Sequence, residues 1–329
     1  MIDPRAQRTG AKRLPWSDAS SDAAATGPRF TPADSFLVFA YAVVAREAAA
    51  LAAKRRAGAE MPTPHEIHQL RVTARRLRVA LRLFRRLLPS RDVAHFRAEL
   101  RWFASSLGDA RDLDVYTESF KQYAQGLPPD RRRELSDYEL YLRRERAEAR
   151  QRAAAAFESA RAAALFDELQ RFAAAGPSAG ALRRWRSLSI REAVRRSMRG
   201  SVGRVRRLGR ELDERSRATE LHALRIRTKR LRYELEFFAE VYPELAQTAE
   251  ACKALQDLLG AHQDAYTANA RFRRYAASLR KQGGDGTLPP ALAELRRSQL
   301  AQARAVRKSF KERWPAFAAT IDAARRAIS

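Results

Sequence analysis

Cysteine is almost absent from this sequence. Only Cys252 occurs among 329 residues, which excludes a disulfide framework within the chain and a zinc site built on cysteines. Long apolar runs are also missing, because the longest, residues 37–45, ends at Arg46, and no apolar stretch follows the charged start of the chain. We therefore expect an intracellular, cytoplasmic protein without a membrane span.

Glycine and proline are few, and strand signals are missing. The chain has 14 glycines and 14 prolines, many of them in short groups such as 61–64, 107–109, 126–129, 176–180 and 283–290. No alternation of β-branched and polar residues is long enough to predict a strand. The stretches between these breaks have the length of bundle helices, so the sequence predicts an all-α fold.

The start of the chain differs in composition from the rest. Residues 1–30 are small, polar and aperiodic, which predicts a disordered tail. We expect order to begin at Thr31 as a helix N-cap, with Pro32 in the first helical position and Asp34 in the first turn. With 45% hydrophobic residues, the remaining length is sufficient to bury a core.

Acidic residues are scarce relative to basic ones. The chain has 64 Lys and Arg against 38 Asp and Glu, a formal net charge of +26, and only eight of the basic residues are lysine. This excess favours a polyanionic partner through long-range attraction. A GC-rich genome, which favours Arg and Ala codons, explains the arginine excess equally well. Arginine forks nevertheless suit phosphate oxygens wherever several of them converge.

An internal repeat organises the chain. Residues 68–89 align without gaps on residues 222–243, with nine of 22 positions identical. A second pair of similar segments, 107–112 and 259–264, follows at nearly the same distance. We interpret the chain as a tandem duplication. Its parts are repeat one (31–175), a linker (176–180) and repeat two (181–328).

Each repeated helix places cations on one face. At about 100° per residue, Leu70, Leu77 and Leu81 form an apolar stripe, which predicts the buried side. A second stripe, about 130° away, is a ladder of basic residues that extends over about 21 Å. This length fits an extended polyanion better than a mononucleotide. The ladder consists of His68, Arg71, Arg75, Arg78 and Arg82 in repeat one, and of His222, Arg225, Lys229 and Arg232 in repeat two.

A solvated helix face is the alternative interpretation of this ladder. Residues 68–86 contain seven arginines and no acid, so like charges repel along a face that normally mixes both signs. Apolar residues also border the ladder on its far side, for example Val79, which is Tyr233 in repeat two. We therefore favour a ligand-facing groove over a solvated face.

Both repeats carry the pattern His-x-x-Arg-(Val/Ile)-x-x-(Arg/Lys)-Arg-Leu-Arg, each followed by Leu-Gly-x-x-x-Asp. This pair of motifs resembles the CHAD domain, the conserved-histidine α-helical domain. The resemblance implies two pseudo-symmetric antiparallel helical bundles with a basic central groove or pore that binds inorganic polyphosphate. It further implies association with polyphosphate granules in bacteria. The Glu-x-Glu-x-Lys signature of the triphosphate-tunnel domain often fused to CHAD domains is not found, so we expect a stand-alone CHAD protein.

The resemblance also implies a set of polyphosphate-binding residues. They are His68, Arg71, Arg75, Arg76, Arg78, Arg82, His222, Arg225, Lys229, Arg230, Arg232 and His262. Arg82 and His262 lack a basic counterpart in the other repeat. Neighbouring positive charge is expected to lower the pKa of the histidines and leave neutral rings that donate one hydrogen bond to a phosphate oxygen. A structural hydrogen bond near the helix start is the alternative for both ladder histidines.

Motifs for catalysis and metal binding are also missing. The sequence has no Walker-type phosphate loop, no His-Glu-x-x-His and no Gly-x-Ser-x-Gly. A divalent metal at Asp109, Asp112 and Asp114 is possible in principle. We instead expect a helix stop at Gly108, with Asp109 as the next N-cap. Asp112 and its repeat counterpart Asp264 are expected to orient ladder arginines. We therefore predict a non-catalytic protein without metal or cofactor.

Nucleic acid is the main rival ligand, because RNA or DNA can be bound through phosphates alone. Base stacking requires exposed aromatic rings, whereas Phe84, Tyr233 and Phe238 lie at apolar or flanking positions. We rank polyphosphate first, nucleic acid second and a polyphosphate-processing enzyme third. The sequence carries no indication of oligomeric state or of the preferred length of polyphosphate.

Overall fold

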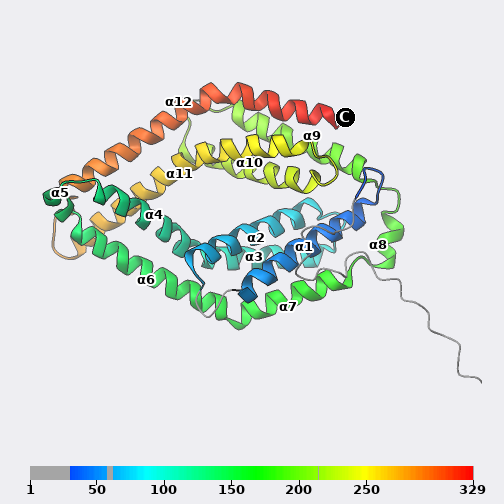
Figure 1. Ribbon diagram of the computed structural model, residues 1–329, viewed down its shortest axis with the longest axis horizontal. Coiled ribbons are helices and arrows are strands. Elements are labelled where there is room, and N and C mark those ends of the chain that lie inside the picture. The colour runs from blue at the N-terminus through cyan, green and yellow to red at the C-terminus, as the bar shows by residue number, and fades with distance from the viewer. Residues whose placement is uncertain (1–29, 58–61, 214, 329) are drawn as a thin grey trace, which may run out of the picture.

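A computed structural model describes residues 30–57, 62–213 and 215–328 (Figure 1). The all-α prediction is confirmed. The described residues form twelve helices, and their one strand-like pairing is an antiparallel bridge between Ser35 and Ser189. The segment expected to be a disordered tail lies outside the described residues, apart from Phe30.

The helices of the first half occupy the lower part of Figure 1, and those of the second half the upper part. The first half contains α1 (Phe36–Ala57), α2 (Pro64–Leu83), α3 (Ser90–Ser106), α4 (Gly108–Gln125), α5 (Pro129–Arg133), α6 (Ser136–Glu158) and α7 (Ala160–Ala175). The short α8 (Ala179–Arg184) connects the halves. The second half contains α9 (Ile190–Arg210), α10 (Ala218–Phe238), α11 (Leu245–Lys281) and α12 (Pro290–Ala327).

Packing follows the same order in both halves. Helix α2 packs against α1, α3 and α4, as α10 packs against α9 and α11. The α3–α4 pair packs on α6 and α7, as α11 packs on α12. Breaks at Leu107 and Ser159 divide in the first half what is continuous in the second. This order agrees with a tandem duplication, while the symmetry between the halves stays a prediction.

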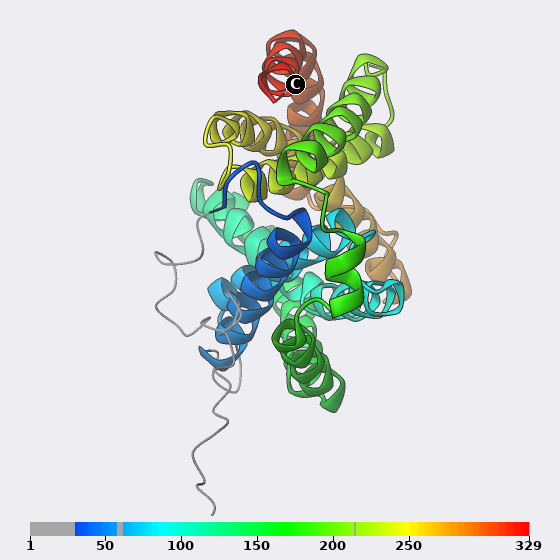
Figure 2. The same cartoon turned by 90° about the vertical axis from the view of Figure 1, so that its right-hand side faces the viewer.

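One core runs through both halves. Leu70, Leu77 and Leu81 are fully buried, so the apolar stripe of α2 faces inward as its spacing predicts. The ring of Phe39 on α1 lies 6.0 Å from Phe84 at the end of α2 and 6.3 Å from Phe238 on α10. These shared aromatic contacts fix α2 and α10 relative to each other. Figure 2 shows most of the second half above the first, while the C-terminal part of α11 descends beside the first half.

The first helix starts later than expected, so the predicted N-cap at Thr31 is wrong. The N–H of Phe36 donates to the Leu188 carbonyl at 2.9 Å. The N–H of Ile190 donates to the Asp34 carbonyl at the same distance. These bonds pair the residues just before α1 with those just before α9, and α1 therefore begins at Phe36.

The predicted N-cap at Asp109 is also wrong. Only Leu107 separates α3 from α4, and α4 begins at Gly108. Asp109 therefore lies in the first turn, where its carboxylate is still favoured by the helix dipole. The matching Gly260 lies inside α11, which continues without a stop. The repeated glycine therefore has a reason other than ending a helix.

Helix α1 has the length and composition of a membrane span. However, 61% of its most apolar window is buried inside the fold, as in the core helix of a helical bundle. This burial agrees with the expectation of no membrane span.

Candidate polyanion-binding site

The two ladder helices have defined starts. At α2 the Glu66 N–H donates to Thr63 Oγ1 at 3.2 Å, and the Thr63 N–H donates to the Glu66 carboxylate at 2.6 Å. This reciprocal pair is a capping box. At α10 the Arg217 N–H donates to Glu220 Oε2 at 2.6 Å. Each ladder helix therefore begins one turn before its histidine, which fixes the register of the cations that follow.

Four cations face one another between α2 and α10, and we call them the central cation cluster. Its members are Arg71, Arg75, Arg225 and Lys229. Burial, together with the charges of Arg75 and Arg225, lowers the pKa of Lys229 to about 7. Burial also lowers the pKa of Arg225, and its Nε has no hydrogen-bond partner within the described ranges. The structure thus brings four cations together, and three acids act on them: Asp112, which pairs with Arg71, and Asp257 and Asp264, which act on Arg225 through their charge.

Arg71 is oriented by the second repeated motif. Its Nη1 donates to the Gly108 carbonyl at 2.5 Å and to Asp112 Oδ1 at 3.1 Å. The prediction that Asp112 orients a ladder arginine is therefore confirmed. A Cβ on Gly108 would lie 3.8 Å from Arg71 Nη1, so the guanidinium packs directly on this glycine.

Arg225 occupies the matching position in the second half. A Cβ on Gly260 would lie 3.5 Å from Arg225 Nη2. Asp264 acts on Arg225 through its charge, which raises the arginine pKa against burial, but the two form no ion pair. The repeated Leu-Gly segment therefore provides a flat surface for one arginine in each half.

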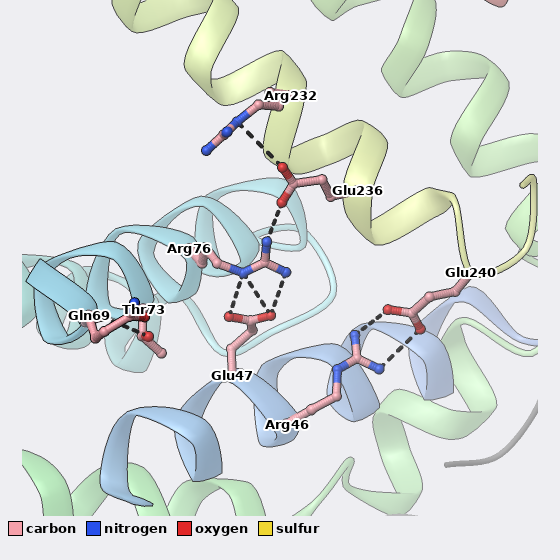
Figure 3. Close-up of polar contacts among 8 residues, drawn as sticks. All are labelled: Arg46, Glu47, Gln69, Thr73, Arg76, Arg232, Glu236 and Glu240. Carbon is pink, nitrogen blue, oxygen red and sulfur yellow. Dashed lines mark hydrogen bonds and ion pairs between the residues drawn. The ribbon is translucent and has the colours of Figure 1, made fainter. Parts of the chain in front are cut away.

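Arg76 lies on the other side of α2, in a group that we call the sealed flank. Figure 3 shows its guanidinium between Glu47 of α1 and Glu236 of α10. Arg76 Nε donates to Glu47 Oε2 at 3.0 Å, and Nη1 donates to Glu236 Oε2. The guanidinium also lies over Phe237, 5.1 Å from the ring centroid. Two carboxylates therefore engage Arg76 inside the fold, apart from the central cation cluster.

Arg232 lies next to the sealed flank. Its Nε is 3.4 Å from Glu236 Oε1, and its guanidinium lies 4.8 Å from the ring centroid of Tyr233. Glu236 therefore holds both Arg76 and Arg232 (Figure 3). Unlike Arg76, Arg232 also lowers the pKa of Lys229 through its charge, and it therefore adjoins the central cation cluster.

A pocket on the opposite side of α10 gathers further arginines, and we call it the flank pocket. It is lined by Arg82, Ser201, Arg204, Val205, Arg227, Arg230, Leu231 and Glu234. Burial, followed by the charges of Arg82 and Arg227, lowers the pKa of Arg230 to about 10. Burial also lowers the pKa of Arg82. Loss of hydration is the largest cause of both shifts, and the charges of neighbouring arginines add to it.

Arg78 connects the central cation cluster to the flank pocket. Burial and the charges of Arg101, Arg97 and Arg75 lower its pKa, and its buried Nε has no partner among the described residues. Because Arg97 also acts on Arg230, the same side chain of α3 faces both groups. The cations therefore form one continuous path from the middle of α2 to its end.

The ladder histidines lie at the start of this path. Loss of hydration and the charges of Arg111 and Arg71 lower the pKa of His68, so its ring is neutral at pH 7 as expected. Nδ1 of His222 is buried and has no hydrogen-bond partner in the part of the chain that the structure describes. The choice between ligand contact and a structural hydrogen bond for the two ladder histidines stays a prediction.

His262 lies elsewhere. Its side chain is only 1% exposed, and its Nε2 accepts a hydrogen bond from Arg307 Nε at 3.2 Å. Burial and Arg307 lower the pKa of His262 to about 4. The structure therefore places His262 in the packing of α11 against α12 and not with the cations of α2 and α10.

Four arginines near the path were missed by sequence reasoning: Arg97, Arg101, Arg204 and Arg227. None of them has a basic residue at the equivalent position of the other repeat, so comparison of the two halves could not select them. The missing signal was the order of packing, which brings α3 and α9 beside the ladder helices.

The fold and the site together define a class, an all-helical protein with a continuous path of half-buried basic side chains. The chain belongs to the CHAD domain family, whose sequence model matches residues 42–273.

Two solved structures share this fold. The CHAD domain of the plant Ricinus communis superposes with a TM-score of 0.68 and 22% identity, covering 91% of this chain and 96% of that one. PptA from Streptomyces chartreusis superposes with a TM-score of 0.66 and 19% identity, covering 86% of this chain and all of that one. At these identities the likeness establishes the fold.

Two curated relatives are uncharacterized proteins from two strains of Mycobacterium tuberculosis. Each is 30% identical over 221 residues, which make up 67% of this chain and 42% of the relative. The chain therefore spans about two fifths of the length of the curated relatives it matches.

Proposed function

We propose that this protein binds inorganic polyphosphate along α2 and α10 and catalyses no reaction on it. One observation carries the proposal. On the described helices α2 and α10, seven half-buried cations have neither a hydrogen-bond nor an ion-pair partner for their side chains. They are Arg75, Arg78, Arg82, Arg225, Arg227, Lys229 and Arg230. An extended chain of phosphates supplies the missing negative charge at each of them.

The aromatic residues of the site support polyphosphate over nucleic acid. Tyr233, Phe237 and Phe238 on α10 and Phe84 at the end of α2 are all buried, with exposed fractions of 2% or less. Binding of single-stranded nucleic acid normally uses exposed aromatic rings on which bases stack. The described surfaces of α2 and α10 offer charge without such rings.

The proposal also covers the location of the protein and its lack of a metal site. We place the protein in the cytoplasm on polyphosphate granules, because a non-catalytic binder of long chains accumulates where these chains are stored. Among the described residues, no three His, Cys, Asp or Glu side chains gather as a candidate metal site.

A competition experiment tests the ligand. Long-chain polyphosphate is expected to displace a labelled oligonucleotide from the protein at physiological salt, and failure to displace it would overturn the proposal. Incubation of polyphosphate with the protein and Mg²⁺, followed by chain-length analysis, tests the absence of catalysis. Shortened chains would identify a polyphosphate-processing enzyme instead.

Polyphosphate affinity is expected to fall as pH rises from about 7 to 9. Free Lys229 has a pKa of about 7, and phosphate oxygens favour its charged form, so binding takes up a proton above pH 7. Calorimetry in two buffers of different ionisation enthalpy measures this uptake. The Lys229→Arg variant keeps its charge and is expected to lose most of the pH dependence. An equally steep dependence in that variant would contradict the assignment.

The stability of the free protein is expected to change in the opposite direction. The unfolded chain, in which Lys229 has its ordinary pKa of 10.5, binds more protons than the folded chain between pH 7 and 10.5. Lys229 therefore makes the free energy of unfolding rise with pH in this window. Urea denaturation of the Lys229→Arg variant and the unchanged protein across this window isolates the contribution.

A further inference from the structure

The two sides of the α2–α10 contact differ in charge, although the repeat makes them equivalent in sequence. Arg76 in repeat one aligns with Arg230 in repeat two, and Glu236 aligns with Arg82. On the sealed flank Arg76 is bonded to Glu236. At the equivalent place in the flank pocket, Arg230 and Arg82 repel each other. An ion pair on one side is thus replaced by two like charges on the other.

The second acid of the sealed flank is also missing from the flank pocket. Glu47 lies on α1, which corresponds to α9, and the same sequence offset places Ser201 at its position. Ser201 Oγ donates to Glu234 Oε2 at 2.5 Å and accepts from Arg204 Nη2 at 2.9 Å. Burial raises the pKa of Glu234, the one acid in the lining of this pocket. The lining therefore holds one acid against four arginines.

Such an arrangement is costly in an isolated protein. The charges of neighbouring arginines add to the burial that lowers the pKa of Arg82 and Arg230, whereas the sealed flank shows how the same fold neutralises this position. The flank pocket is also continuous with the central cation cluster through Arg78. The missing counter-charge therefore lies on the path that the proposed ligand follows.

Resting on the proposed function, we propose that the flank pocket is a second phosphate subsite, present on one side of α10 only. A polyphosphate chain held by the central cation cluster continues over the mouth of this pocket, where the side chains of Arg82, Arg204, Arg227 and Arg230 bind its next phosphates. The sealed flank closes the equivalent path on the other side. Binding is therefore directional, and affinity depends on chain length.

The test uses the full chain and two ligands, tripolyphosphate and long-chain polyphosphate. Combined Arg204→Ala and Arg227→Ala substitutions are expected to weaken binding of the long chain at least tenfold and to reduce the salt dependence of log K by about 1 to 2. Tripolyphosphate, which is short enough for the central cation cluster alone, is expected to keep its affinity within twofold. Equal losses for both ligands would overturn the proposal.

The matched control removes two exposed arginines from α9, the helix that carries Arg204, by Arg199→Ala and Arg207→Ala. It lowers the net charge equally and is expected to change long-chain affinity less than threefold. If the control loses as much affinity as the flank variant, the flank pocket is not a subsite. If the unchanged protein binds neither ligand, the proposed function itself fails, so the two failures are distinguishable.

A second variant separates binding from folding. Arg82→Glu gives the flank pocket the acid that the sealed flank has at Glu236, within reach of Arg230. It is expected to preserve or raise the melting temperature, since an ion pair replaces a repulsion, while long-chain affinity falls at least tenfold. Undiminished long-chain affinity in a folded Arg82→Glu protein would overturn the proposal.

Discussion

Replacement of Arg75 and Lys229 by alanine is expected to weaken the binding of long-chain polyphosphate about a hundredfold. Each side chain loses one charge-assisted contact with phosphate, for a combined cost of about 3 kcal/mol. The slope of log K against log salt is expected to become shallower by about 1 to 2. Titration of the double variant at several salt concentrations measures both effects.

The matched control for this double variant removes one arginine and one lysine from exposed positions, by Arg199→Ala and Lys121→Ala. It is expected to keep long-chain affinity within threefold. Helicity is expected to be unchanged in both variants, because alanine favours helices and the substitutions relieve repulsion. Equal affinity of the Arg75 and Lys229 variant and the unchanged protein would place the binding face elsewhere.

Gly209→Ala is expected to lower the free energy of unfolding by about 3 kcal/mol. A Cβ at this position would lie 1.9 Å from the Trp314 ring, because the indole of α12 packs directly on the backbone of α9. Accommodating even one methyl group requires the ring or the helix to move, and overpacking of this kind costs about 1–3 kcal/mol or more. Urea denaturation measures the loss.

Gly203→Ala on the same helix is the matched control. No atom lies within 4 Å of a Cβ there, and the position is exposed. This variant is expected to gain about 0.5–1 kcal/mol, because alanine favours a helix interior over glycine. A loss of stability at Gly209 together with a gain at Gly203 would show that the loss comes from packing against Trp314. Trp314→Ala removes the ring that the added methyl group meets, so Gly209→Ala is expected to cost less stability in a Trp314→Ala protein than in the unchanged protein. An equal cost in both would contradict the packing explanation.

Much of the fold could be predicted from local signals. The apolar stripe of α2 and the capping sequence Thr63-Pro64 fix a helix and its buried side without reference to the rest of the chain. The start of α1 could not be found in this way. It depends on backbone bonds to Leu188 and Ile190, which are distant in sequence and carry no side-chain signature.

The site was only partly visible in the sequence, for a related reason. Arg75 and Lys229 occupy equivalent positions of the two repeats, which identified them as a pair of basic residues, and the structure places them together. The repeat could not separate Arg76 from Arg75 and Lys229, because the carboxylates that bind Arg76 come from other helices. Likewise Gly108 indicates a helix end to a sequence reader, whereas the structure also shows its carbonyl accepting a hydrogen bond from Arg71.

The unequal flanks have a consequence for the covalent joining of the two halves. In a symmetric homodimer of one half, every residue is present at both flanks, so an acid that seals one side also seals the other. A fused duplication removes this constraint, and the chain carries Glu236 on one side and Arg82 on the other. Covalent linkage thus permits one entrance for the ligand and one closed, stabilising joint, which two identical subunits could not provide.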